Sequence, residues 1–233
     1  MTEGRLADVE PFLASGADVV LNGRDADRLA KAAAGLGRPE RTAWAAGSIA
    51  ERETGESLVR TALERFGRID VLVNNAGTFA PKPFTEVTED ELDGFLTGNL
   101  KGTYLTTQAV VRALRAQGQG GSIVNIGTVL VDHGLAGLPA SAPVVSKAGV
   151  HGLTTSLAAE LAADGIRVNL VAPGIIRTPL HEGADVDGFG GLALLDRVGE
   201  ASEIAEAVLY LAGAGFVTGH ALRVNGGHVT GRA

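Results

Sequence analysis

Short apolar runs alternate with longer stretches of mixed polarity along this chain. The runs have the length of strands buried on both faces of a parallel sheet, and the stretches between them have the length of helices. Strands are predicted over 17–21, 42–45, 69–73, 122–126, 166–171 and 221–225, and helices over about 5–15, 25–35, 51–66, 88–117, 143–163 and 201–212. This alternation predicts an α/β fold, a doubly wound parallel sheet in one domain over residues 1–233.

Polar residues mark where three of these helices begin. Asp25 precedes the second helix, and the run Thr88-Glu89-Asp90-Glu91 has the spacing of a capping box. Ser202 stands at the start of the last predicted helix and is expected to cap it.

The run at 69–73 ends in Asn74-Asn75-Ala76-Gly77, a small, polar turn closed by glycine. Ligands of open parallel sheets collect beyond the carboxyl ends of the strands, where such a turn lets a flat ligand approach the backbone. The alternative is an ordinary end of a strand, and spacing alone does not separate the two.

Composition narrows the classes of function. The chain has 233 residues, of which 45% are hydrophobic, and its mean hydropathy is +0.17, so it can bury a sizeable core. The net charge is −7 and no block of Lys or Arg occurs, which argues against a nucleic-acid or anionic-membrane partner and favours a small molecule. Cysteine is absent, which excludes disulfides and thiolate chemistry.

The sequence also bears on where the protein works. No apolar run approaches the roughly 20 residues needed to cross a bilayer. Residues 1–10 are polar and acidic, unlike a signal peptide, so the cytoplasm is the expected location.

The NNAG turn does not stand alone. Four further stretches accompany it: Gly98-Asn99-Leu100-Lys101-Gly102, Ser146-Lys147-Ala148-Gly149, APGIIRTP at 172–179 and Val224-Asn225-Gly226-Gly227. Together with the NNAG turn, they resemble the short-chain dehydrogenase/reductase family from about Ala17 to the C-terminus. The resemblance implies a single Rossmann-like domain, hydride transfer between NAD(P)(H) and a carbonyl or secondary alcohol, and a homodimer or homotetramer built through two long helices.

The resemblance also implies where the cofactor, NADP or else NAD, would bind. Asn75, Ala76 and Gly77 would lie along the adenosine ribose, and Pro173, Gly174 and Thr178 would hold the nicotinamide carboxamide. Lys147 would bind the ribose hydroxyls, and no metal site is predicted.

Arg24 stands where the family places a basic residue for the 2′-phosphate of NADP. The alternative is a solvated arginine that Asp25 and Asp27 neutralise.

The family's glycine-rich phosphate loop, TGxxxGxG, is not found before residue 17, where Glu3-Gly4-Arg5 falls near the expected end of the loop. The first strand of the family, which lies between the strands at 17–21 and 69–73, is expected to be missing with it. Three repairs are open: the sheet closes directly, another segment or a second chain inserts, or the natural protein starts earlier.

Carried over by resemblance, the catalytic residues are Asn99, Thr128 in place of the family's serine, and Lys147. The family's tyrosine, four residues before the lysine, is Pro143 here. Proline has no ionisable proton, and loss of an acid/base group typically costs about 10²- to 10⁴-fold in rate. The hydroxyls of Ser141 and Ser146 are too basic to exchange protons near neutral pH and do not share the helix face of Lys147. His133, His151 and an ordered water remain as candidate replacements.

Three functions remain open. The first is an oxidoreductase of this family with weakened activity. The second is a non-catalytic relative that binds a ligand or pairs with an active partner, and the third is a biosynthetic enzyme that uses the old pocket without hydride transfer.

Overall fold

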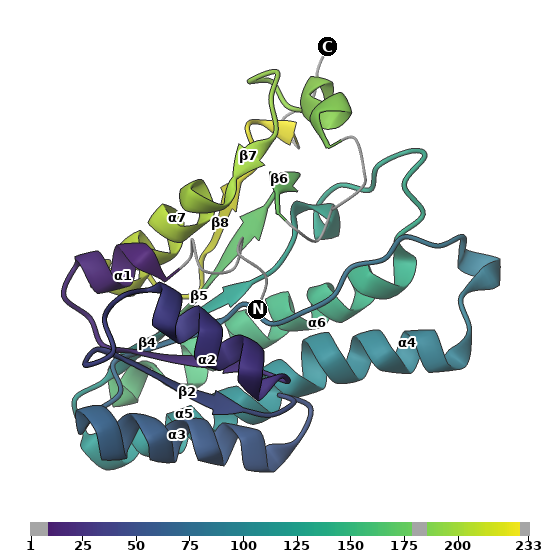
Figure 1. Cartoon of the computed structure of the whole chain (residues 1–233). Helices are drawn as coiled ribbons and strands as arrows, with labels where there is room; N and C mark the ends of the chain where they lie inside the picture. Colours follow the sequence, from purple (N-terminus) through teal and green to yellow (C-terminus); the bar gives the residue numbers. More distant parts are fainter. Residues whose placement is uncertain (1–8, 179–185, 229–233) are drawn as a thin grey trace.

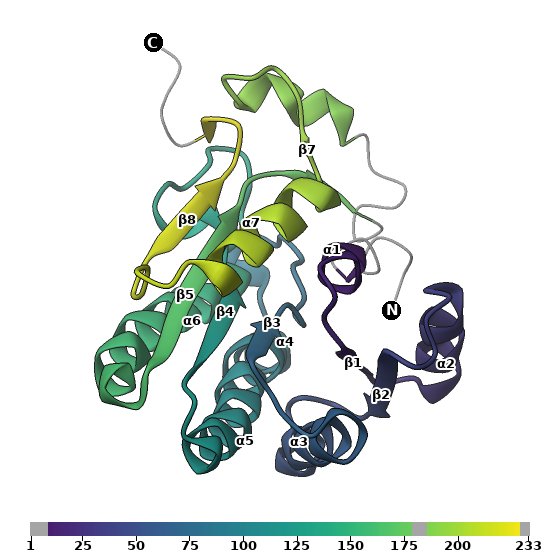
Figure 2. The same ribbon diagram turned by 90° about the vertical axis from the view of Figure 1, so that its left-hand side faces the viewer.

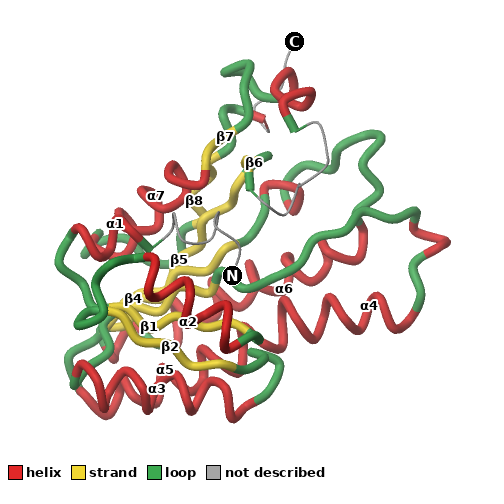
Figure 3. The backbone as a smooth tube through the Cα atoms, in the orientation of Figure 1, coloured by secondary structure: helices red, strands yellow, loops and turns green. Residues whose placement is uncertain are grey.

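The computed structural model describes residues 9–178 and 186–228, in which helices cover both sides of a set of parallel strands (Figures 1 and 3). The strands are β1 (Val19–Gly23), β2 (Thr42–Ala46), β3 (Val71–Asn74), β4 (Gly121–Ile126), β5 (Ile166–Pro173), β6 (Ile176–Arg177), β7 (Gly199–Glu200) and β8 (Ala221–Val224). The α-helices are α1 (Glu10–Ala14), α2 (Ala26–Gly35), α3 (Arg52–Phe66), α4 (Glu89–Phe95), α5 (Gly102–Gln117), α6 (Ser141–Glu160) and α7 (Ala201–Gly213). No helix in these ranges is long and apolar enough to span a bilayer.

The strands divide into separate ladders. β1 pairs with β2, whereas β3, β4, β5 and β8 pair in that order, all in parallel, and β6 pairs with β7. Among the described residues no strand joins β1 to β3, and Figure 2 shows the two ladders lying apart. The doubly wound α/β class is confirmed, with a break where the family resemblance puts a further strand.

The edge of β3 at this break has peptide groups that face no strand of the described residues. The Ser122 N–H donates to the Asp70 carbonyl at 2.9 Å, so in the alternation of a parallel ladder the peptide groups of Leu72 face β4. Those of Val71 and Val73 point the other way, where the described part of the chain offers no strand.

The main core lies in the four-stranded sheet. Ile123, Val124, Val168 and Leu170 are fully buried there. Figure 2 shows α5 and α6 on one face of this sheet and α7 on the other. The core therefore fixes the carboxyl ends of β3, β4 and β5, where the predicted site residues gather.

Side chains link the β1–β2 ladder to the rest of the molecule. Leu21 packs with Leu29 of α2 in a small cluster of their own, while Val20 packs against the main core cluster. Helix α3 bridges the two parts, because it packs on β2 and on α5.

The observed strands β1 and β3 begin two residues later than predicted. Ile69 is buried, at 9% exposure, but precedes β3. An apolar pattern reports burial, whereas a strand also requires ladder hydrogen bonds, so the pattern placed the strand too early.

Two of the three predicted helix caps are confirmed. The Arg28 N–H donates to the Asp25 carboxylate at 3.0 Å, and Thr88 forms its capping box with Glu91. The Ser202 cap is wrong, because α7 begins at Ala201 and its N-cap is Glu200, whose N–H donates to the Glu203 carboxylate at 2.9 Å.

The long helix predicted over 88–117 has a break in its regularity. Between α4 and α5 lies one π-helical segment, η3 (Leu96–Lys101), and Asn99 lies within it. Such π-helical turns inside longer helices occur frequently at functional sites.

Candidate active site

Asn99, one of the predicted catalytic residues, is buried and makes three side-chain hydrogen bonds. Its side chain is 1% exposed. The amide oxygen accepts from the Thr78 N–H at 2.8 Å, and the amide nitrogen donates to the Thr78 carbonyl at 3.0 Å and to the Ser146 hydroxyl at 2.9 Å. Asn99 thus ties the segment after the NNAG turn to α6.

Lys147 reaches the same place from α6. Its Nζ donates to the Ile126 carbonyl, at the end of β4, at 2.7 Å. A Cβ built on Gly77 would lie 3.2 Å from this Nζ and 3.0 Å from the Asn99 amide oxygen. The structure therefore brings Gly77, Asn99 and Lys147 together at the carboxyl ends of β3 and β4.

Thr128 follows β4 by two residues in an extended conformation. Its hydroxyl oxygen accepts from the Leu130 N–H at 3.2 Å, which orients the side chain. The hydroxyl hydrogen can still be donated to a substrate oxygen.

Pro143 lies in the first turn of α6, which begins at Ser141 and so two residues earlier than predicted. The residue is buried, and its carbonyl accepts from the Ser146 hydroxyl at 2.7 Å. Residues four apart share a helix face, so Pro143 stands on the face of Lys147 and offers it no acidic proton.

Ser146 has a role in the site that the sequence did not predict. It is fully buried, accepts from Asn99 and donates to the Pro143 carbonyl. The available signal was its spacing of three residues from Pro143, but the partner across the site, Asn99, is 47 residues away in the chain.

The two histidines considered as replacements take different positions. His151 Nε2 is buried without a hydrogen-bond partner in the described structure, and a Cβ on Gly127 would lie 2.7 Å from it. Desolvation lowers the pKa of His151 despite the opposing charge of Asp132. His133 is exposed, and its ring lies edge-on to His228 at 6.4 Å between centroids.

A network of buried polar side chains connects the strands beneath the site. The Asn74 amide donates to Asn125 at 2.8 Å and to Thr107 at 2.9 Å, and the Asn125 amide donates to the Thr154 hydroxyl at 2.8 Å. These bonds connect β3, β4, α5 and α6. They therefore fix the end of β3, which Gly77 follows, and the end of β4, where the Ile126 carbonyl accepts from Lys147.

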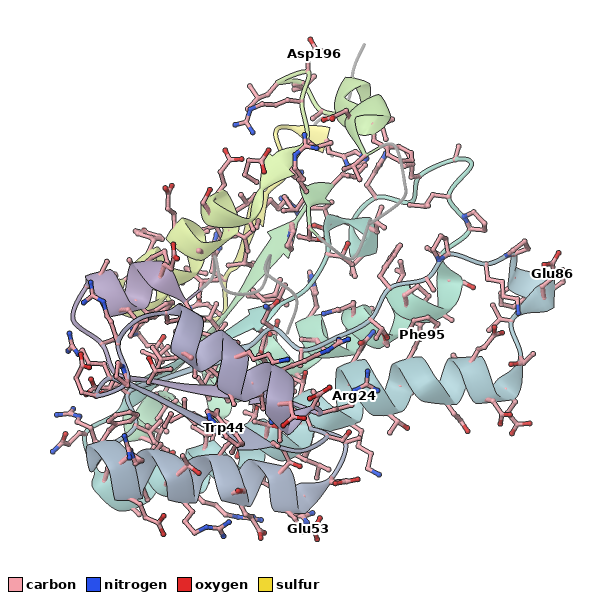
Figure 4. All side chains as sticks on the ribbon, in the orientation of Figure 1. Arg24, Trp44, Glu53, Glu86, Phe95 and Asp196 are labelled. Carbon is pink, nitrogen blue, oxygen red and sulfur yellow. The ribbon has the colours of Figure 1, made fainter. Side chains whose placement is uncertain are left out.

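Arg24 follows β1 directly and lies exposed beside the start of α2 (Figure 4). The neutralisation that the sequence allowed is not found, because Asp25 pairs with Arg28 at 3.6 Å and caps α2. Within the described ranges Arg24 itself has no ion pair, so its guanidinium is available to an anion.

The remaining predicted contacts lie along the same edge. Asn75 and Ala76 are half-buried between β3 and Gly77. Gly174 packs so close to β8 that an added Cβ would lie 2.8 Å from the Asn225 Cα. Pro173 is the last residue of β5, where it pairs with Val224 of β8, and Thr178 directly follows β6.

These residues fit the two ends of a nicotinamide dinucleotide. Arg24 offers a cation at the end of β1, and the Lys147 ammonium offers another beside Gly77. A glycine-rich phosphate loop does not occur in residues 9–178 or 186–228, and neither does a group of three potential metal ligands. The described residues thus include cations that could hold the ends of such a cofactor, at Arg24 and Lys147, but no loop of the kind that holds its pyrophosphate.

Comparison with known proteins gives the family. Residues 7–229 match the family model described as enoyl-(acyl carrier protein) reductase. The chain is 38% identical to a (2S)-[(R)-hydroxy(phenyl)methyl]succinyl-CoA dehydrogenase subunit of Thauera aromatica, over 93% of this chain and 88% of that protein. It is 37% identical to a 3-oxoacyl-[acyl-carrier-protein] reductase of Thermotoga maritima, over 94% of this chain and 90% of that protein.

Solved structures agree. A short-chain type dehydrogenase/reductase from Mycobacterium marinum superposes with a TM-score of 0.92 at 28% identity, over 97% of this chain and 91% of that one. A gluconate 5-dehydrogenase from Burkholderia cenocepacia, in complex with NADP and tartrate, has a TM-score of 0.88 at 28% identity, with the same coverage. With the family model, the relatives and the fold in agreement, this chain belongs to the short-chain dehydrogenase/reductase family.

Proposed function

We propose that this protein is an NAD(P)-dependent oxidoreductase whose hydride transfer on a carbonyl or secondary alcohol is slow. The observation that carries the proposal is the meeting of Asn99 and Lys147 beside Gly77, with Pro143 on the lysine's helix face. When bound, the nicotinamide supplies or accepts the hydride. The relatives named above, which are dehydrogenases and reductases, support this class of reaction.

NADP is the favoured cofactor in this proposal. Arg24 has no described ion pair, and a guanidinium binds phosphate oxygens through paired hydrogen bonds. The complex of the Burkholderia cenocepacia enzyme with NADP is a further support.

The cofactor preference is tested by calorimetry with NADPH and NADH. We expect Arg24→Gln to weaken NADPH binding by about 10-fold, because a charge-assisted hydrogen bond to phosphate is lost, and to leave NADH binding unchanged. Arg60→Gln, on the exposed side of α3, is the control. Equal losses for both nucleotides would contradict the assignment of Arg24 to the 2′-phosphate.

The slow rate that we propose for hydride transfer follows from the residues present in the site. Thr128 can donate its hydroxyl hydrogen to a substrate oxygen, and the Lys147 ammonium adds positive charge nearby. Neither supplies a titratable group at the position of Pro143, so we expect a rate about 10²- to 10⁴-fold below that of an enzyme with the acid/base group.

Restoring the phenol tests this account. Pro143→Tyr places an acidic hydroxyl one turn before Lys147, and Pro143→Phe has the same shape without the proton. Proline is not required in the first turn of α6, because the first N–H groups of a helix lack partners within it. With NADPH and a panel of small ketones, the tyrosine variant is expected to exceed the phenylalanine variant by 10²-fold or more.

The same measurements separate the other functions. If neither nucleotide binds, a non-catalytic ligand-binding or partner protein replaces the oxidoreductase. If NADPH binds and Pro143→Tyr stays as inactive as Pro143→Phe, a reaction without hydride transfer in the old pocket becomes the better hypothesis.

We also propose a homodimer or homotetramer through α5 and α6. Tyr104 of α5 and Val145 of α6 expose 50% and 56% of their surface. Between Ser141 and Ala159, Lys147 is the one residue of the types Lys, Arg, Asp and Glu. A large uncharged helix face suits burial against a second copy. Light scattering of the purified chain tests this, and a monomer at micromolar concentration would contradict it.

A further inference from the structure

His151 lies between the candidate active site and a hollow on the surface. It follows Lys147 by one turn of α6, so both residues lie on the same face of the helix. The residue is half-buried, and it lines a hollow of about 170 Å³ together with the exposed residues Thr155 and His220. Its Nε2, by contrast, is buried. The proposed hydride transfer gives this side chain no role.

The buried part of the ring packs against Gly127. A Cβ on Gly127 would lie 2.7 Å from His151 Nε2 and 2.8 Å from the side chain of Leu170 in β5. The Gly127 N–H also donates to the Val171 carbonyl at 2.8 Å. The backbone that leads into Thr128 is therefore bonded to β5 and in contact with the imidazole.

Thr128 is held less firmly than Gly127. Its hydroxyl oxygen accepts from the Leu130 N–H at 3.2 Å, and its carbonyl accepts from the Val131 N–H at 3.5 Å, which is long for a hydrogen bond. A carbonyl oxygen has two lone pairs, so the Thr128 carbonyl can accept a further and stronger bond.

The surroundings keep the His151 ring neutral near pH 7. Desolvation is the largest influence and lowers its pKa below the ordinary 6.5, and the charges of Lys147 and Arg223 act in the same direction. Asp132 raises the pKa, although it also pairs with Arg223 at 2.8 Å. The backbone of Thr128 raises it as well, because it can accept a hydrogen bond from the charged ring.

We propose that His151 is a positioning residue that controls Thr128 through its protonation. The neutral ring packs against Gly127 and leaves Thr128 bonded to Leu130 and Val131. The protonated ring donates to the Thr128 carbonyl and draws the residue, with its hydroxyl, out of that position. The inference rests on the proposed function, in which the Thr128 hydroxyl donates to a substrate oxygen.

The first test follows Thr128 by NMR in the full chain labelled with ¹⁵N and ¹³C, as the pH is lowered from 8 to 4.5. The ring resonances of His151 report its protonation, and the three-bond couplings to the Thr128 methyl carbon report the χ1 rotamer. We expect these couplings to change with the same midpoint as the ring, below pH 6.5. The measurement requires neither nucleotide nor turnover.

Matched variants separate protonation of His151 from other effects of pH. His151→Gln keeps a polar side chain that reaches about as far and does not titrate, so the Thr128 couplings should lose their dependence on pH. His151→Phe covers the case in which the glutamine variant fails to fold. His220→Gln makes the same change at the other histidine of the hollow and should behave as the wild type.

The second test measures turnover in a Pro143→Tyr background with saturating NADPH. Reduction of a ketone requires the phenol in its protonated form, so a lower pH does not by itself slow this step. We expect kcat to fall by at least about 10-fold as the His151 ring is protonated, because a hydrogen bond to the substrate oxygen is lost. The fall should be absent when His151→Gln is added.

Two results would overturn the proposal. One is a set of Thr128 couplings that stays constant as the pH falls to 4.5. The other is a dependence on pH that persists in both His151→Gln and His151→Phe. A chain that binds no nucleotide would end the proposed function instead, and the NMR titration would still decide whether His151 positions Thr128.

Discussion

Gly77 is a site position with little room for a side chain. A methyl group there would crowd the Asn99 amide oxygen at 3.0 Å and the Lys147 Nζ at 3.2 Å. Both groups are already held by hydrogen bonds, to Thr78 and to Ile126, so neither can move away without breaking one. A side chain at this position is thus disfavoured by contact rather than by backbone conformation.

We expect Gly77→Ala to weaken NADPH binding by about 10-fold, the equivalent of one lost hydrogen bond to a charged group. Calorimetry measures the affinity, and a thermal scan shows whether the fold is retained. Gly98→Ala is the matched control, because a Cβ there meets no atom within 4 Å. Unchanged binding in Gly77→Ala would place the cofactor elsewhere.

For single residues, prediction from the sequence succeeded where the interacting residues are close to each other in the chain. The spacing of Pro143 and Lys147 placed both on one face of α6, as observed. It failed for Ser146, because the role of that hydroxyl depends on Asn99, which only tertiary packing brings to it.

At the scale of elements, helix starts were predictable because their hydrogen bonds are local. Asp25 and Thr88 cap helices that begin one residue later. The π-helical segment η3 was not predicted, since it spans only six residues inside one long helical pattern.

The start of α7 carries a measurable dependence on pH. Hydrogen bonds from Arg197, and then from the Glu200 N–H, lower the pKa of Glu203 to about 2. Because the pKa is lower in the folded state than the ordinary 4.5, the ionised carboxylate stabilises the fold above pH 4.5, and this contribution is lost as the pH falls toward 2.

We therefore expect Glu203→Gln to lower the urea midpoint at pH 6 and to have less effect near pH 2. The effect is modest, because the pair is partly exposed and water screens it. Glu206→Gln, on the same helix, serves as the control. A constant difference between wild type and Glu203→Gln from pH 6 to pH 2 would refute the assignment.

At the scale of the whole molecule, the sequence predicted the layers but not their connections. Apolar runs identified every main strand, because burial on both faces leaves a strong pattern. They did not reveal how the β1–β2 ladder is held, since that depends on Val20 and α3 packing across the break.

Because no ladder hydrogen bonds cross the break in the described part of the chain, the β1–β2 ladder and α2 should open more readily than the rest. We expect amide hydrogens of Val20 and Leu21 to exchange at least about 10-fold faster than those of Val124 and Val168, which lie in the centre of the continuous sheet. Native-state hydrogen exchange followed by NMR measures this. Equal protection in the two ladders would show that side-chain packing alone couples them fully.

The break has a thermodynamic consequence for the proposed cofactor. A nucleotide bound to Arg24 at one end and Lys147 at the other would bridge the two ladders, and a ligand stabilises the conformation that it binds. The binding free energy of NADPH would then appear chiefly as cooperative unfolding of the two ladders, which we expect to open separately when no nucleotide is bound.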